Sequence, residues 1–113
     1  MSSFQSLRDL TWSAAEKKAA RGAFEQAYHK QCTAIAAKVK QMIGQASTDP
    51  TVIWSIHDYL SQERKNMAEV FDYRYSVLIT VFGKLLRDGW LTESELAGLQ
   101  EDKIEKIRHW ARF

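Results

Sequence analysis

Two pairs of residues in this 113-residue chain carry side chains that could do chemistry. The first pair is His57 and Asp58, and a carboxylate beside an imidazole is a common arrangement for a general base. Neighbouring residues of a helix point about 100° apart, however, and the local sequence places no serine or cysteine nucleophile beside this pair. The spacing argues against catalysis, and we predict that the protein is not an enzyme.

The second pair is His29 and Cys32, whose spacing would let both side chains reach one metal ion from a helix. A zinc site needs at least three protein ligands, and no second pair of ligands occurs at a recurrent spacing. We interpret the pair as a surface histidine near a half-buried thiol, and predict neither a metal nor a cofactor. A metal-dependent enzyme is the least favoured alternative.

Composition argues against several classes of partner. The 16 basic and 14 acidic residues leave a net charge of +2, too small to indicate nucleic acid or anionic lipid. The longest nearly apolar run, residues 77–82, is far shorter than the roughly 20 residues of a membrane-spanning helix. With one cysteine and no signal-peptide pattern at the N-terminus, we expect a cytoplasmic protein without an intrachain disulfide.

The elements that position these residues are predicted to be helices. Residues 13–16 (SAAE) form a capping box, which predicts a helix that begins at Ala14 and runs about 30 residues. Gly44 is a plausible left-handed residue at its end. Residues 49–50 (Asp-Pro) predict the start of a second helix near the proline, which continues to about Asp72.

The C-terminal part of the chain gives three further helices. Residues 77–86 are apolar nearly all round, which predicts a central helix with Gly89 as its stop. A second capping box at residues 92–95 begins a short helix, and a last helix covers about residues 101–112. Because no run alternates apolar and polar residues, we predict no strand and an all-α fold.

The length of the first helix has a consequence for assembly. A helix of about 30 residues is about 45 Å long, whereas a compact globule of this chain length is about 35 Å across. Apolar positions that extend beyond the globule need cover, and a second copy packed antiparallel about a two-fold axis supplies it economically. We therefore predict a long-helix hairpin stalk and a homodimer formed through that stalk.

The start of the second helix carries the residues best suited to recognise a partner. Trp54, His57, Asp58 and Ser61 share one stripe of the helix. Beside it runs an apolar stripe: Ile53, Ile56, Leu60 and Met67. Asp58 and Arg64 lie about 120° apart around the helix, so each needs a partner elsewhere. Tryptophan and arginine often contribute most of the binding energy of an interface. We therefore favour an intermolecular role for these residues over an intrachain contact or a solvated face.

An ordered set of motifs between Trp12 and Phe113 resembles the fluorescence recovery protein family. The motifs are Trp12-Ser13, Ala27-Tyr28, Trp54-x-x-His57-Asp58-x-Leu60-Ser61-x-x-Arg64, Asp72-x-Arg74-x-Ser76-Val77, Val81-Phe82, Leu85-Leu86, Glu95-Leu96, Asp102-Lys103 and Lys106-Ile107. The ordered set is specific, whereas any one of these pieces alone is not.

The resemblance implies a small non-enzymatic regulator of photoprotection. Such a regulator binds the photoactivated, red orange carotenoid protein through that protein's C-terminal domain and speeds its return to the orange form. It also helps to detach the carotenoid protein from the phycobilisome, which ends non-photochemical quenching. Residues 1–10 lack sustained periodicity, which predicts a flexible tail before a single all-α domain (11–113). The resemblance implies that this domain has a stalk (about 11–75) and a head (about 76–113). The implied location is the cytoplasm or the cytoplasmic face of the thylakoid membrane.

Matching by position assigns two groups of site residues. The first is a patch at or beside the dimer interface: Trp54, His57, Asp58 and Arg64. The second is a pair of head contacts, Thr80 and Lys106, where Thr80 replaces an aromatic residue found in a family member. The main alternative is a helical homodimeric adaptor with a partner unrelated to photoprotection, because the same periodicities would serve it equally well.

Overall fold

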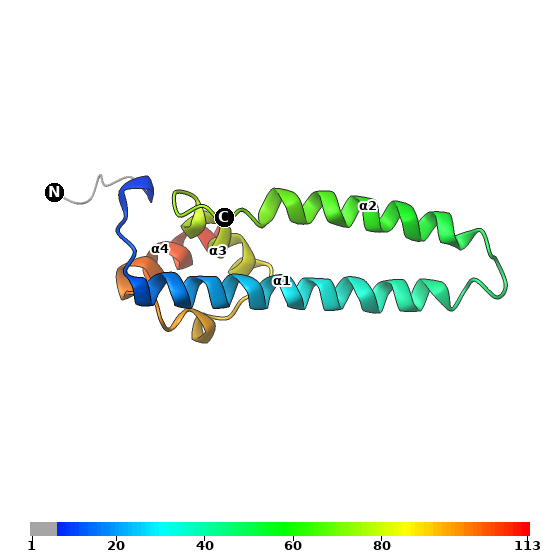
Figure 1. The fold of residues 1–113 in the computed structure, drawn as a ribbon, viewed down its shortest axis with the longest axis horizontal. Coiled ribbons are helices and arrows are strands. Elements are labelled where there is room, and N and C mark those ends of the chain that lie inside the picture. The colour runs from blue at the N-terminus through cyan, green and yellow to red at the C-terminus, as the bar shows by residue number, and fades with distance from the viewer. Residues whose placement is uncertain (1–6) are drawn as a thin grey trace.

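The computed structural model describes residues 7–113, which form an elongated molecule of 64 × 23 × 22 Å. A long helical hairpin extends to one side of a smaller group of helices (Figure 1). In chain order the regular elements are η2 (Leu7–Asp9), α1 (Ala14–Ile43), α2 (Val52–Val70), α3 (Leu78–Arg87), η3 (Glu93–Leu96) and α4 (Glu101–Ala111). All are helical, which confirms the predicted all-α class. We call the α1–α2 hairpin the stalk and the group α3, η3 and α4 the head.

Helix α1 begins where the sequence predicts. The Ser13 hydroxyl accepts a hydrogen bond from the Glu16 N–H, and the Glu16 carboxylate accepts one from the Ser13 N–H, each at 3.1 Å. This capping box opens a helix of 30 residues, which is the predicted length. The predicted left-handed stop is wrong, because Gly44 has a φ of -58°. The helix end instead tightens into turns such as the one that bonds the Gln45 N–H to the Met42 carbonyl.

Helix α2 begins at Val52, two residues after the proline near which its start was predicted. The Asp49 carboxylate accepts hydrogen bonds from the N–H and the hydroxyl of Thr51, at 3.1 and 2.5 Å. Asp49 therefore closes a turn that precedes the helix, as short polar side chains commonly do. At its other end α2 stops at Val70, shortly before the predicted end.

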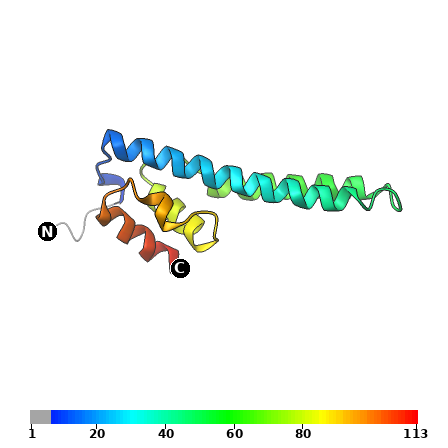
Figure 2. The same ribbon diagram turned by 90° about the horizontal axis from the view of Figure 1, so that it is seen from below.

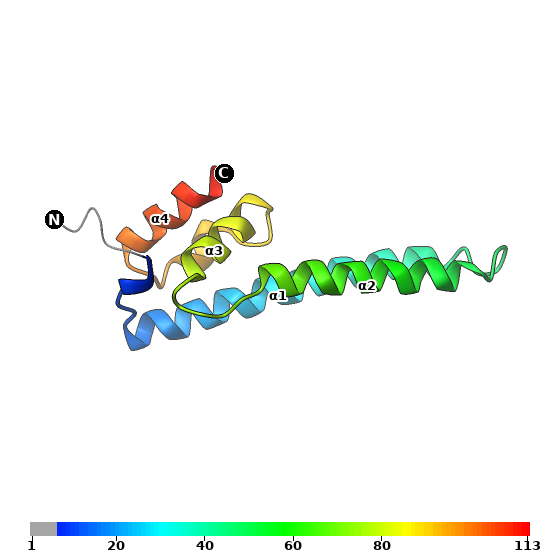
Figure 3. The ribbon, with the colours of Figure 1, turned by 90° about the horizontal axis from the view of Figure 1, so that it is seen from above.

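The hydrophobic core lies where the head packs against the N-terminal half of α1, and the head covers only one side of that helix (Figure 2). Its buried members are Trp12, Ala20, Ala23, Phe24, Ala27, Leu78, Ile79, Val81, Phe82, Leu85, Leu91, Leu96, Leu99, Ile104 and Ile107. The central place predicted for residues 77–86 is confirmed, since α3 supplies five of these side chains. In the rest of the stalk, α1 and α2 lie side by side and contact each other (Figure 3).

Helix α3 ends in a turn that requires glycine. Gly89 has a φ of +83°, the Trp90 N–H donates to the Leu85 carbonyl at 2.9 Å, and the Gly89 N–H donates to the Leu86 carbonyl at 3.3 Å. These two bonds define a Schellman motif, so the predicted stop at Gly89 is confirmed. The second capping box is confirmed as well, and it opens η3.

An aromatic cluster fixes the irregular segment, residues 71–77, that joins the stalk to the head. The Phe24 ring lies 5.3 Å from the Phe71 ring and 4.9 Å from the Tyr73 ring, both edge to face. The Tyr73 hydroxyl donates to the Lys17 carbonyl at 3.3 Å, and the Arg21 guanidinium lies 3.8 Å from the Tyr73 ring centre. Burial, reinforced by Tyr75, raises the pKa of Tyr73 to about 12.

The N-terminal residues fall partly outside the described range. Residues 1–6 of the predicted tail are not among the described residues, whereas Leu7 and Leu10 pack against the core. Within residues 7–113, none of the helices combines the length and hydropathy that crossing a bilayer requires.

Candidate functional site

An apolar groove runs between the two helices of the stalk, close to its junction with the head. The groove has a volume of about 420 Å³. Its walls are Tyr28 and Ile35 from α1, Leu60, Glu63, Arg64, Met67 and Ala68 from α2, and Phe71. Glu63 and Arg64 supply the charged groups of an otherwise apolar lining, an arrangement that suits binding to another apolar surface with a defined orientation.

Exposure along one side of α2 rises away from the head. Met67, Leu60 and Ile53 follow one another at intervals of two turns, and their exposed fractions are 7%, 41% and 50%. Only part of the predicted apolar stripe is therefore core, because Ile56 packs inward while Leu60 and Ile53 do not. Ile43 at the end of α1 is exposed as well. A two-helix hairpin cannot bury both sides of each helix, so the outer side remains open to a partner.

The four predicted patch residues are all exposed on α2, and of the four Arg64 lines the groove. Trp54 is 66% exposed, a large apolar area for a side chain without cover. His57 Nδ1 lies 3.4 Å from Asp58 Oδ1, and both side chains are exposed. This long, solvated contact is unlike a catalytic pair. Arg64 lines the groove, and no ion pair joins it to Asp58 in the described chain.

The two predicted head residues lie on different helices. Thr80 is half-buried on α3, and its hydroxyl donates to the Val77 carbonyl at 2.6 Å. Lys106 is half-buried on α4 and lines a shallow depression together with Leu7 and Trp110. Both residues therefore belong to the head, whereas Trp54, His57, Asp58 and Arg64 belong to the stalk.

Sequence reasoning missed part of the groove. Tyr28 and Ile35 lie on α1, and nothing in the local sequence indicates that they face the same groove as Arg64. Ala68 carries no signal at all, since a small residue on a helix is compatible with any surface.

The second candidate pair has the predicted surroundings. His29 is exposed and Cys32 is half-buried, which confirms a surface histidine near a half-buried thiol. Among the residues that the structure describes, no group of three or more His, Cys, Asp or Glu side chains is placed to hold a metal ion.

Comparison with known proteins decides the family. Residues 12–111 match the model of a family described as the photoprotection regulator fluorescence recovery protein. The chain belongs to the fluorescence recovery protein family. It is 37% identical over 105 residues to the fluorescence recovery protein of Synechocystis sp. (strain ATCC 27184 / PCC 6803 / Kazusa), across 93% of this chain and 95% of that protein.

Solved structures of fluorescence recovery proteins share the fold. The protein from Fremyella diplosiphon superposes with a TM-score of 0.82 at 38% identity, and the protein from Synechocystis sp. PCC 6803 with 0.83 at 36%. Each comparison covers 91% of this chain and 100% of the other. The family and the helical architecture predicted from the sequence are therefore confirmed, and the family is one of photoprotection regulators.

Proposed function

We propose that the protein is a non-enzymatic regulator that binds photoactivated orange carotenoid protein and accelerates its return to the orange form. In this proposal it recognises the C-terminal domain of the carotenoid protein and helps to detach it from the phycobilisome, which ends non-photochemical quenching. The observation that carries the proposal is the match of residues 12–111 to the family of photoprotection regulators, over nearly the whole described chain. It acts in the cytoplasm, either free or peripherally on the thylakoid membrane.

The working form in this proposal is a homodimer through the stalk. The support is the uncovered side of the stalk, where Ile53 and Leu60 are exposed and Leu60 lines the groove beside Arg64. Large apolar side chains grouped on one exposed side are typical of a protein interface. A second stalk, packed antiparallel, has the same surface to bury and covers both copies at once.

An antiparallel dimer also explains why patch and head would act together. Trp54 precedes Arg64 by about 15 Å along α2. If the two-fold axis lies near the groove, Trp54 of each copy is displaced toward the head end of its partner. In that arrangement Trp54, His57 and Asp58 form the rim of the interface, while Arg64 lies near its centre.

Acceleration without chemistry requires selective binding. A protein speeds the partner's relaxation only if it binds the transition state for domain closure more tightly than it binds the open form. We infer that the stalk patch grips one domain exposed by photoactivation. The head, through Thr80 and Lys106, or the second subunit then favours the return of the other domain.

Size-exclusion chromatography with light scattering tests the assembly and the binding together. The protein alone should elute with the mass of a dimer. Mixed with carotenoid protein, it should form a complex with the red form under illumination and little with the orange form in darkness. Equal binding to both forms would contradict selective recognition, and a monomeric mass would contradict the stalk dimer.

A further inference from the structure

The head is attached to α1 at two charged points. At the first, the Glu16 carboxylate accepts the Gln100 N–H at 3.0 Å and lies 3.0 Å from the Lys103 ammonium. At the second, the Lys30 ammonium donates to both oxygens of Glu95, at 2.8 and 2.9 Å. Lys30 follows Glu16 after nearly four helical turns, so the two points lie about 21 Å apart on nearly the same side of α1.

The segment between these points lies along α1. A Cβ atom at Gly98 would stand 2.4 Å from the Ala19 Cβ, so the backbone of the head touches the helix there. The buried core, with Ala20, Ala23 and Ala27 of α1, already holds the head against the helix between these two points. An ion pair at the end of this contact farther from Glu16 limits the tilt that remains about the core.

The two points differ in their access to solvent. The Glu16 and Lys103 side chains are 4% and 5% exposed, whereas those of Glu95 and Lys30 are 19% and 44% exposed. Buried pairs are little affected by salt, but exposed ones are screened. The first point is therefore a fixed pivot, and the second can be weakened without disrupting the core.

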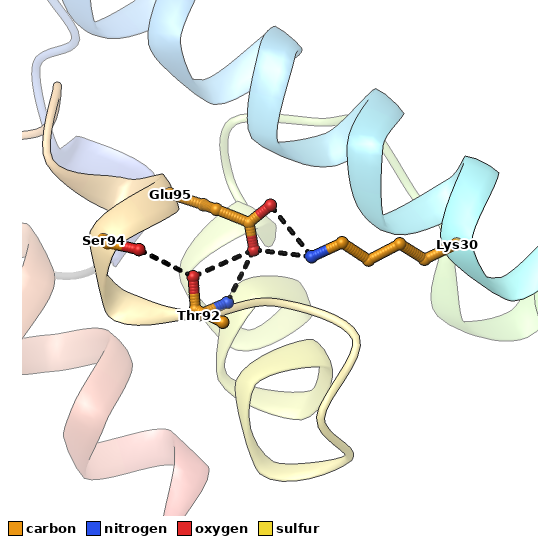
Figure 4. A network of polar contacts seen from close by, with 4 residues as sticks. All are labelled: Lys30, Thr92, Ser94 and Glu95. Atoms are coloured by element: carbon orange, nitrogen blue, oxygen red, sulfur yellow. Dashed lines mark hydrogen bonds and ion pairs between the residues drawn. The ribbon is translucent and has the colours of Figure 1, made fainter.

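Hydrogen bonds within η3 hold the Glu95 carboxylate in place independently of Lys30. Its Oε1 accepts the N–H and the hydroxyl of Thr92 at 2.9 and 3.0 Å, and the Thr92 hydroxyl also lies 3.0 Å from the Ser94 hydroxyl (Figure 4). Because the turn of η3 already orders this carboxylate, only the Lys30 side chain loses freedom when the pair forms. The pair thus joins α1 to a rigid turn of the head rather than to a mobile side chain.

We propose that Lys30 and Glu95 are positioning residues, whose ion pair sets the tilt of the head against the stalk. The tilt determines how far the head contacts, Thr80 and Lys106, lie from the stalk patch around Trp54. The inference rests on the proposed function, because a fixed tilt matters only if patch and head act on the same partner.

Two substitutions separate the ion pair from the cap. Glu95→Gln keeps Oε1 as an acceptor for Thr92 but removes the negative charge and replaces Oε2, which accepts from Lys30 at 2.9 Å, with an amide N–H₂. The ion pair is therefore lost and the cap remains. Lys30→Met removes the pair from the other side. Lys18→Met is the matched control, since Lys18 is exposed on the same helix and has no ion pair among the described residues.

The experiment measures the head-to-stalk distance and the function in the same variants. In a Cys32→Ser background, spin labels at Lys38→Cys in the stalk and Lys84→Cys in the head report the intrachain distance, with excess unlabelled protein suppressing interchain signals. We expect Glu95→Gln and Lys30→Met to broaden the distance distribution, and we expect high salt to broaden it in the wild type. We also expect each to slow the accelerated relaxation of the carotenoid protein about two- to fivefold, the effect of losing an exposed pair. The double variant should be no slower than either single variant.

The other possible results would overturn the tilt assignment, the positioning role or the proposed function, as follows. An unchanged distance distribution in both variants would overturn the role of the pair in setting the tilt. A broadened distribution with unchanged relaxation, or an equal effect of Lys18→Met, would overturn its positioning role. If the wild-type protein failed to accelerate relaxation while Glu95→Gln still broadened the distribution, the proposed function would fall and the tilt assignment would stand.

Discussion

Glu16 and Lys103 are 87 residues apart in the sequence and form a buried ion pair, with 3.0 Å between Oε2 and Nζ. The same carboxylate accepts the backbone N–H of Ser13 at the start of α1 and of Gln100 at the start of α4. The side chain of Gln100 does not cap α4, so Glu16 serves amide groups at the beginning of both helices. The Lys103 ammonium in turn lies 5.1 Å from the Trp12 ring centre.

Removing one member of this pair should strongly destabilise the fold. Glu16→Ala leaves the Lys103 ammonium buried without its counter-charge and frees two amide groups, so we expect a loss of about 3–5 kcal/mol in the free energy of unfolding. Urea unfolding at one fixed protein concentration measures it, with Glu25→Ala as a control on an exposed glutamate of the same helix. Equal losses in the two variants would refute the special role of Glu16.

Acid should destabilise the fold through two carboxyl groups. Burial raises the pKa of Glu16, but two backbone N–H groups and the Lys103 ammonium outweigh it and hold the pKa below its ordinary value of 4.5. The Lys30 ammonium and the cap at Thr92 likewise lower the pKa of Glu95. Both groups bind protons less readily in the folded state, so their stabilising contribution is complete above about pH 4.5 and is lost as the pH falls through the folded values.

Unfolding measured between about pH 7 and about pH 3 tests this dependence. The free energy of unfolding should decline below about pH 4.5, and Glu95→Gln should decline less steeply because one of the two groups no longer titrates. A Glu95→Gln profile parallel to that of the wild type would show that Glu95 contributes nothing to the acid sensitivity.

Two glycine substitutions should have effects of opposite sign. Gly22 lies within α1, and a Cβ atom there meets nothing within 4 Å, so Gly22→Ala should stabilise the protein by about 0.5–1 kcal/mol. Gly89 has a φ of +83°, so Gly89→Ala should destabilise it by about 1 kcal/mol. Thermal unfolding of the two variants gives the comparison, and shifts of the same sign would contradict the Schellman assignment or the openness at Gly22.

The groove arginine should matter far more than its neighbour. Arg64→Leu removes a charged group that would orient a partner surface bound in the apolar groove. Lys65→Leu changes an exposed residue that does not line the groove. At an interface centre such a loss is about 2 kcal/mol, or about thirtyfold, in dimerisation or in partner binding. Sedimentation of the dimer and relaxation of the partner are the two measurements. If Arg64→Leu changed neither, the patch assignment would be wrong.

Local signals predicted the helix ends that depend on local chemistry. The capping box at Ser13 and Glu16 and the left-handed stop at Gly89 hold because their hydrogen bonds join residues a few positions apart. The left-handed conformation predicted for Gly44 was wrong, because turns of the 3-10 type satisfy the last carbonyls of α1 without a left-handed residue. The start predicted near Pro50 is displaced to Val52 because the Asp49 carboxylate bonds to Thr51 in the turn before α2.

Contacts between distant segments could not be predicted. Periodicity places Ile53, Leu60 and Met67 on one side of α2, but it cannot distinguish core from an uncovered surface. The capping box alone accounts for a glutamate at position 16, so nothing in the sequence indicated its ion pair with Lys103. The sequence likewise predicted Glu95 only as part of a capping box, and its partner Lys30 lies 65 residues away.

The dark decay of photoactivated orange carotenoid protein, followed by visible absorbance, tests the central proposal most directly. The decay is measured with and without a substoichiometric amount of this protein, after its dimer has been verified in the same buffer. We predict faster decay at that ratio, because each dimer is released when its partner returns to the orange form and then acts on another. Unchanged decay in the presence of a well-folded dimer would contradict the proposal and favour a helical adaptor with a different partner.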